Sequence, residues 1–399
     1  MEADMKARTK QLARIARVGV VAALLLALAA CDTRDWLQPA GDAAHRRWNP
    51  GAKTLTAANV GSLRQAWHTD GPTGAFVVSR SVYGVSSSTL YSLDLATGAI
   101  QWAKTPSAPI TGGPFVDSVD TIRISYGSAF GDGFETTFDR NGASPSDQGD
   151  DHAEAIQGAL VVRDAGRSVR VRASGSPSTE GWIDVSGTPM RGSFYPAAFA
   201  ARATVAAGRV YVPQAYNGHT FVVSAYDPSR ACTNGFCEAL WSAGIGTGDV
   251  TVSPDGSTLF VPSSEMTVPI LTALDAATGT ERWSRTEVSG GVATDGDSVF
   301  VAGGDVFAPR SLRALDPDTG VTKWTAVEAA SGAVAVGAHL VFGAFGSEVR
   351  AFDADGCGST TCQPLWSAEV DSPVSSIVLA RGRVFVGTAT GITAFRLPL

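Results

Sequence analysis

The sequence predicts an all-β fold, a β-propeller built from four-stranded blades, and three observations lead to this prediction. First, a phrase of the form A-L-D-x-x-T-G-x-x-x-W occurs at residues 273–283 and again at 314–324, with a close copy at 92–102. Second, from Trp241 onward the tryptophans recur after 42, 41 and 42 residues, a period typical of repeat architectures. Third, each period contains four short stretches of apolar or small residues separated by turn residues, which is the plan of a propeller blade.

Each part of the repeat has a predicted place in the blade. A small-residue stretch such as 333–336 comes first and is followed by an apolar run such as 339–342. The A-L-D phrase and a short strand with the tryptophan complete the unit. The apolar runs do not alternate with polar residues, as expected for strands that are buried on both faces between neighbouring sheets.

The predicted number of blades is eight, with seven as the alternative. Five units end clearly, at Trp102, Trp241, Trp283, Trp324 and Trp366. The 139 residues from Trp102 to Trp241 leave room for three units, two of them degenerate. The phrase at residues 392–396 stops before its outer strand, and residues 63–67 near the N-terminus can supply that strand and close the ring. If the middle holds two blades with long insertions, the count falls to seven.

The recurring turn residues are expected to have structural roles. An Asp and a Thr side chain can accept hydrogen bonds from backbone N–H groups of the turn, and the Gly supplies the positive φ that closes the hairpin. The Trp that follows is expected to dock its indole against the adjacent blade. Metal binding by the Asp residues is the alternative, but turn capping explains every copy at once. The residues assigned to these roles are Asp94, Gly98, Trp102, Asp275, Gly279, Trp283, Asp316, Gly320 and Trp324.

The first thirty residues have the pattern of a targeting segment. A basic stretch is followed by an apolar core at residues 18–30, which is too short to span a membrane as a helix. The core ends in L-A-A-C at 28–31, which resembles the lipobox of bacterial lipoproteins. The resemblance implies cleavage before Cys31 and attachment of lipid, palmitate included, to its thiol; an ordinary secretory peptide is the alternative. The predicted divisions are a signal peptide (1–30), a lipidated arm (31–52) and a propeller (53–399).

The charge of the exported chain limits its partners. The formal charge is −7, and loss of five basic and two acidic residues with segment 1–30 gives −7 − 3 = −10. A domain this acidic argues against binding to nucleic acid or by charge to anionic lipid, so a lipid anchor is the expected membrane contact. A monomer is expected, because a closed ring needs no partner chain.

The four remaining cysteines form two pairs with equal spacing, Cys232 with Cys237 and Cys357 with Cys362. Both pairs lie where a longer loop replaces the D-x-x-T-G turn, so a local disulfide can close the hairpin. Zinc is the weaker alternative, since the spacing is not that of a zinc knuckle and the pairs lie on different blades. Disulfides indicate an oxidising, extracytoplasmic compartment.

The phrase at 273–283 and 314–324 resembles the tryptophan-docking repeat of quinoproteins, and the resemblance covers about Trp36 to Leu399. It implies a propeller like that of pyrroloquinoline quinone (PQQ) dehydrogenases, which hold PQQ and calcium on the axis and stack the quinone on two adjacent cysteines. It equally implies likeness to cofactor-free members such as the propeller lipoprotein of the outer-membrane barrel-assembly machinery. This chain has no adjacent cysteines and no C-x-x-C-H haem motif. No cofactor is therefore expected, with PQQ and calcium kept as the less favoured possibility.

Other chemistries have no motif in the sequence, which lacks H-E-x-x-H, G-x-S-x-G and a P-loop. The histidines are scattered, and His45 and His68 are interpreted as surface or cap residues; no metal site and no catalytic residue is assigned. The acidic stretch 147–154, with Asp150 and Asp151, is a solvated loop or, as the sharper hypothesis, a calcium site.

Together these features predict a non-catalytic, membrane-anchored extracytoplasmic lipoprotein of the cell envelope. Its propeller is expected to act as a scaffold that binds an envelope protein or cell-surface material. Two alternatives stay open: a PQQ-dependent oxidoreductase, and a propeller that binds a small ligand or glycan. The irregular middle, residues 105–205, and the loops around the central channel are the expected binding regions.

Overall fold

The computed structural model describes residues 35–398 with internal gaps. The gaps are at 117–120, 128–132, 145, 150–151, 158–159, 165–168, 174–182, 185–197, 200–202, 217–219, 228–237, 246–247, 264–269, 287–289, 304–310, 328–329 and 331. No helix in the described residues is long and apolar enough to cross a membrane.

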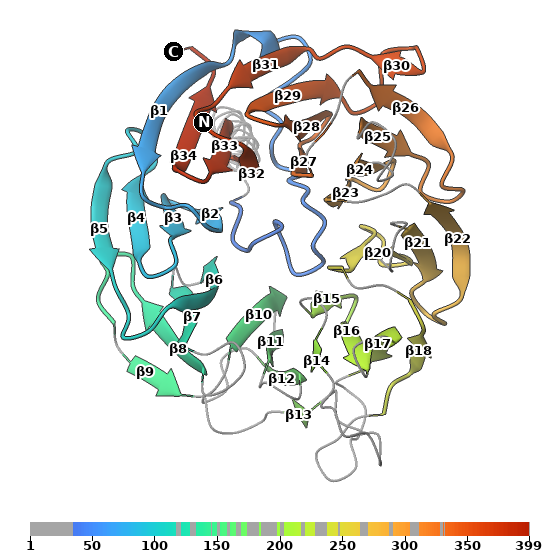
Figure 1. Ribbon diagram of the computed structural model, residues 1–399, viewed down its shortest axis with the longest axis horizontal. Coiled ribbons are helices and arrows are strands. Elements are labelled where there is room, and N and C mark those ends of the chain that lie inside the picture. The colour runs from blue at the N-terminus through green and yellow to red at the C-terminus, as the bar shows by residue number, and fades with distance from the viewer. Residues whose placement is uncertain are drawn as a thin grey trace, which may run out of the picture.

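The described strands form eight sheets arranged around a central axis, as Figure 1 shows, so the predicted propeller is confirmed with the larger of the two expected blade counts. Six sheets have four strands and two have five. Blade 1 contains β2 (Phe76–Val78), β3 (Ser81–Val85), β4 (Leu90–Asp94) and β5 (Ile100–Lys104). Blade 2 contains β6 (Ile110–Val116), β7 (Ile122–Gly127), β8 (Gly133–Phe138) and β9 (Ser146–Gly149). Blade 3 contains β10 (His152–Gln157), β11 (Leu160–Asp164), β12 (Val169–Ala173) and β13 (Ile183–Asp184).

The second half of the ring is more regular in sequence. Blade 4 contains β14 (Ala198–Phe199), β15 (Thr204–Ala206), β16 (Arg209–Tyr216), β17 (Thr220–Tyr226) and β18 (Trp241–Ala243). Blade 5 contains β19 (Thr251–Val252), β20 (Thr258–Ser263), β21 (Ile270–Asp275) and β22 (Glu281–Thr286). Blade 6 contains β23 (Val292–Thr294), β24 (Val299–Gly303), β25 (Ser311–Leu315) and β26 (Thr322–Ala326), with β30 (Thr361–Cys362) added at its edge. Blade 7 contains β27 (Val334–Val336), β28 (Leu340–Phe345), β29 (Glu348–Asp353) and β31 (Trp366–Glu369).

Blade 8 closes the ring with both ends of the chain. It contains β32 (Val374–Ala380), β33 (Arg383–Thr388) and β34 (Gly391–Arg396), and its outer strand is β1 (Arg64–Asp70), which follows the short 3-10 helix η1 (Val60–Ser62). β1 pairs antiparallel with β34, so the predicted closure by the N-terminal strand is confirmed. The approach is close, because a Cβ atom on Gly391 would lie 2.1 Å from the carbonyl oxygen of Thr69.

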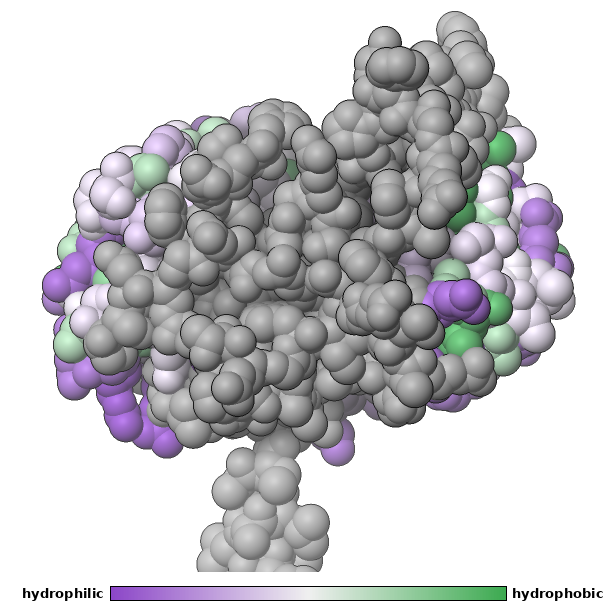
Figure 2. All heavy atoms as spheres, turned by 90° about the horizontal axis from the view of Figure 1, so that it is seen from below, coloured by the Kyte–Doolittle hydropathy of each residue, from purple (hydrophilic) through white to green (hydrophobic). Residues whose placement is uncertain are grey.

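The core lies between blades. Three innermost strands, Phe76–Val78, Val292–Thr294 and Val334–Val336, are buried along their whole length. The second strands, which carry the apolar runs, are buried in the same way, as in Val299–Gly303 and Leu340–Phe345, and this burial on both faces explains why the runs do not alternate. In the described part of the surface, the exposed large hydrophobic side chains are Ile100, Val321 and Leu365, on separate blades. Figure 2 views the molecule from below relative to Figure 1. The described surface on this side is mostly hydrophilic or neutral, with hydrophobic residues (green) confined to small areas.

The ring has two ends, which we name by the connections they carry. The turn face carries the tight turns between first and second strands and between third and fourth strands, for example 79–80, 95–99 and 381–382. The loop face carries the other connections, for example 71–75, 86–89 and 370–373.

Candidate functional site

The D-x-x-T-G turns are built as hydrogen-bonded caps. The Oδ1 atom of Asp275 accepts bonds from the backbone N–H groups of Ala277 and Thr278 and from the Thr278 hydroxyl, each at 3.0 Å. Asp94 and Asp316 accept the same three bonds in their own turns. Gly98, Gly279 and Gly320 follow with φ of 74°, 74° and 68°.

These bonds hold the aspartates in their ionised form. The side-chain hydrogen bond from Arg282 is the main cause that lowers the pKa of Asp275 to about 2. The pKa values of Asp94 and Asp316 are lowered chiefly by the Thr97 and Thr319 hydroxyls. Because one carboxylate oxygen already accepts three bonds in each copy, the turn itself accounts for the recurrence of Asp.

Most of the described repeat tryptophans dock on the turn of the next blade, whereas Trp366 donates to the carbonyl of Leu63, just before β1. The indole Nε1 of Trp283 donates to the carbonyl oxygen of Pro317 at 2.9 Å, and that of Trp324 donates to Ala354 at 3.2 Å. Trp102 donates to Arg140 in the same way. The residue whose carbonyl accepts this hydrogen bond comes directly after the turn Asp. The indole ring lies against the turn Gly. This contact links neighbouring blades around the ring.

The docked indole gives a second reason for glycine in the turn. Besides the positive φ, the indole leaves no room for a Cβ atom. In Gly320→Ala the new Cβ would lie 2.7 Å from Trp283 Cε3, whereas at Gly346, which has the same φ of 68°, a Cβ meets nothing within 4 Å. Gly346→Ala should therefore cost about 1 kcal/mol from the left-handed backbone alone. Gly320→Ala should cost a further ~2 kcal/mol from overpacking. Urea unfolding of both variants checks this, and equal losses would show that the indole moves aside freely.

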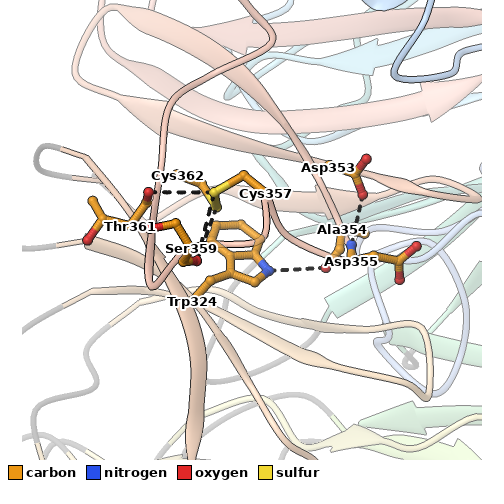
Figure 3. Close-up of a disulfide and its surroundings, with 8 residues drawn as sticks. All are labelled: Trp324, Asp353, Ala354, Asp355, Cys357, Ser359, Thr361 and Cys362. Carbon is orange, nitrogen blue, oxygen red and sulfur yellow. Dashed lines mark hydrogen bonds between the residues drawn. A yellow bond between two sulfur atoms is a disulfide. The ribbon is translucent and has the colours of Figure 1, made fainter.

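The second pair of cysteines forms the predicted disulfide, with Sγ of Cys357 and Cys362 2.10 Å apart. Figure 3 shows the bonded hairpin over the indole of Trp324. The hairpin extends beyond its own blade, because β30 pairs in parallel with β26 of blade 6. The disulfide thus closes a loop that takes part in the contact between blades 6 and 7.

Loss of this disulfide should be measurable. Replacing both cysteines with serine releases a loop with a sequence separation of 5 residues, which should lower the free energy of unfolding by about 2 kcal/mol. Guanidinium unfolding of the double variant against wild type, with dithiothreitol added to wild type as the matched condition, measures the change. An unchanged midpoint in both would mean that β30 pairs with β26 without the covalent link.

The largest departure from sequence expectation is the path of residues 35–49. These residues belong to the predicted segment 31–52, and we call them the arm from here on. The arm runs across the axis of the ring (Figure 1). Its carbonyl oxygens accept hydrogen bonds of 2.7–3.0 Å from innermost-strand N–H groups of six blades. The donors are Val78, Val116, Val205, Val252, Thr294 and Val336. The Asn49 amide adds a bond of 2.6 Å to the carbonyl of Leu379 in blade 8.

His45 lies at the middle of the arm and corrects its interpretation as a surface residue. It is 2% exposed, has φ of 53°, and its Nδ1 lies 3.1 Å from the Thr204 hydroxyl. Its carbonyl accepts a bond from the Thr251 hydroxyl. The axis buries the imidazole because the innermost strands surround it on several sides.

Arg47 extends from the arm along the axis. Its guanidinium donates to the carbonyl of Val292, the first residue of β23, at 2.9 Å and lies 3.9 Å from Asp249. The backbone of Arg46 meanwhile bonds Thr294 at the other end of the same strand. The Arg47 side chain therefore spans from the arm toward the loop face, where it forms an ion pair.

A cavity of about 320 Å³ lies on the rim between blades 1 and 2. It is lined by Arg80, Ser81, Tyr83, Gln101, Trp102, Arg140 and Asn141. Gln101 takes the position before the tryptophan that Arg282 and Lys323 hold in blades 5 and 6. In those blades the long cation donates a hydrogen bond to the hydroxyl of Thr258 or Ser298. The shorter Gln101 accepts hydrogen bonds from the hydroxyls of Ser81 and Ser92 and lines the cavity.

Several predicted site residues fall outside the described residues. These are Cys31 with segment 1–30, Cys232, Cys237, and Asp150 and Asp151 of the calcium hypothesis. The axial position of the arm was not predicted from sequence. The sequence gives little sign of the turns in the arm. Ala40, His45 and Arg47 have positive φ there, but none of them is a glycine, the residue that usually indicates such a turn.

The comparisons with known proteins agree with the propeller. Residues 219–388 match a family described as outer membrane protein assembly factor BamB. No curated protein matches the chain in sequence. BamB from Moraxella catarrhalis is 16% identical, with a TM-score of 0.59 over 84% of this chain and 99% of that one. Quinohemoprotein alcohol dehydrogenase ADHIIG from Pseudomonas putida is 12% identical, with a TM-score of 0.64 over 91% and 80%. The computationally designed Ika8 protein gives 14% and 0.61 over 84% and 99%.

The repeat, the eight sheets and the docked tryptophans define the chain as an eight-bladed β-propeller, similar to the PQQ-like propeller proteins. Within that class its resemblance is to BamB, through the match over residues 219–388. The structural similarities lie below 25% identity and establish the fold alone.

PQQ, which the class implies for some members, fits this chain poorly. The arm occupies the axis at the ends of the innermost strands, and the Arg47 guanidinium that reaches further along the axis is paired with Asp249. The sequence also lacks the adjacent cysteines on which the dehydrogenases stack the quinone. No catalytic step is therefore assigned to the cofactor.

Proposed function

We propose that the chain is a non-catalytic, membrane-anchored extracytoplasmic lipoprotein whose propeller binds a protein or other material of the cell envelope. The observation that carries the proposal is the fixed start of the arm. Asp35 Oδ1 lies 2.7 Å from Arg381 Nη2, and its Oδ2 accepts a bond from the Ser79 hydroxyl at 3.2 Å. The neighbouring Trp36 exchanges two backbone bonds with Val78.

A lipid on Cys31 would then hold the ring in a defined orientation. Ser79 and Arg381 both lie in turns of the turn face, which is where the arm begins. Three residues lie between Cys31 and Asp35, and the four Cα–Cα steps from one to the other span at most about 14 Å. The turn face would therefore lie next to the membrane, and the loop face would point away from it toward a partner. The match to an outer membrane protein assembly factor supports a role in the envelope.

Site-specific photo-crosslinking in envelope membranes tests this proposal. A crosslinker at Ser87, in the loop face, should form one defined adduct, whereas a crosslinker at Thr97, in a turn of the turn face, should not; both positions are exposed. Cys31→Ser should release the chain from the membrane fraction. Adducts from Thr97 alone would show that the turn face, and not the loop face, points toward the partner. If no adduct forms and the purified chain reduces a dye in the presence of PQQ, the scaffold proposal is wrong and the protein is an oxidoreductase.

A second candidate, binding of a small ligand, is favoured by the cavity between blades 1 and 2. Two arginines, two amides and the aromatic side chains of Tyr83 and Trp102 suit a small acidic saccharide. A thermal-shift screen of acidic sugars tests it, with Gln101→Arg as the variant that restores the side chain of blade 5 and fills the cavity. A shift seen equally in Gln101→Arg would place any binding elsewhere.

A further inference from the structure

The seam that closes the ring carries an imidazole and two carboxylates at one point of the loop face. His68 and Asp70 come from β1, and Asp371 comes from the connection between β31 and β32. His68 Nε2 lies 3.0 Å from Asp70 Oδ1 and 3.7 Å from Asp371 Oδ2. One ligand atom from each residue lies within 4.8 Å of the other two, which is the spacing of atoms that share one metal ion.

The surrounding hydroxyl groups orient these ligands. The other ring nitrogen of His68, Nδ1, lies 2.8 Å from the Thr393 hydroxyl, which leaves Nε2 directed at the two carboxylates. The hydroxyls of Thr388 and Thr390 donate to the two oxygens of Asp371. Outer partners of this kind are what fix the ring and the carboxylate in metal sites.

The charge at the cluster is also unbalanced. Within the described part of the chain, the ion pairs of Asp70 and Asp371 are those with His68, and neither carboxylate pairs with a lysine or arginine. Two negative charges thus face one imidazole, which carries at most one positive charge. A divalent cation would balance them.

We propose that His68, Asp70 and Asp371 bind a divalent transition metal, with Zn²⁺ as the preferred ion. Imidazole nitrogen together with carboxylate oxygen is a zinc ligand set, whereas calcium and magnesium prefer oxygen alone. Three protein ligands leave a fourth position for water. The site would join β1, the outer strand of blade 8, to the connection that enters the same blade at β32, and so would stabilise the closure. The inference does not depend on the proposed scaffold function.

Zinc titration of the full chain, purified in detergent without a histidine tag and stripped with EDTA, tests the site. Saturable binding with a rise in Tm is expected for wild type, and Co²⁺ should give the visible bands of a tetrahedral site. His68→Ala and Asp371→Asn should each weaken binding at least about 10-fold, and Thr393→Val about 10-fold through the loss of ring orientation. His339→Ala is the matched control, because His339 lies near a single carboxylate, Asp355, at 3.9 Å.

The outcomes separate the metal site from its alternatives. Absence of zinc binding by wild type would overturn the proposal and leave a His–Asp ion pair. An affinity unchanged in both Asp371→Asn and Thr393→Val would assign binding to other residues. If His68→Ala does not fold, those two variants still decide, since they retain the imidazole.

Discussion

Deletion of residues 35–49 is expected to lower the free energy of unfolding by about 4–6 kcal/mol, at about 1 kcal/mol for each ring N–H that loses its acceptor. Six innermost-strand N–H groups bond the arm, and Trp36 and His45 are each 2% exposed within it. Water can enter the axis and satisfy some of these donors, but it does not restore the apolar contacts of Trp36. Urea unfolding of the deletion variant, followed by tryptophan fluorescence, measures the loss.

Two further measurements separate the arm from a general effect of truncation. A peptide of residues 35–49 added in trans should raise the Tm of the deletion variant, while a scrambled peptide should not. Asn49→Ala removes the bond to Leu379 and should cost about 1–2 kcal/mol without removing the backbone. A deletion variant as stable as wild type would show that the ring is rigid without the arm and that the arm serves only as a tether.

The sequence was informative where one physical requirement recurs in the regular blades. Asp275, Gly279 and Trp283 could be assigned to a turn and a docking contact because the same demand produces the same residues in each regular copy. The closure by β1 was predictable for a related reason, since a phrase without its outer strand requires one from elsewhere in the chain.

The candidate sites were less predictable because they occur once. The position of His45 depends on a path of the arm that is set by contacts with strands more than 150 residues away, such as the one to Thr204. The cluster at His68 joins residues about 300 positions apart, so no local spacing indicates it. The cavity beside Gln101 could have been inferred by aligning the blades, because Gln stands there in place of Arg or Lys.

Trp324→Ala is expected to lower the free energy of unfolding by about 3–5 kcal/mol, the cost of removing a fully buried large aromatic side chain. The indole is 2% exposed and lies between Phe300 and Phe352, with ring centroids at 6.3 and 5.9 Å. Figure 3 shows its Nε1 bonded to the carbonyl of Ala354 under the disulfide hairpin. Its removal would leave a cavity between blades 6 and 7 and would take away the support of that hairpin.

Trp102→Ala provides the matched comparison, because the same docking contact occurs there at a less buried position. The Trp102 side chain is half-buried, lies between Tyr83 and Phe138, and donates to Arg140 at 2.8 Å. Its loss should cost about 1–2 kcal/mol, since less apolar area is returned to water. Guanidinium unfolding of both variants ranks them, and Trp324→Phe should fall between them because it keeps most of the volume and loses the hydrogen bond. Equal costs for Trp324→Ala and Trp102→Ala would mean that the hydrogen bond, which both share, outweighs burial in holding the blades together.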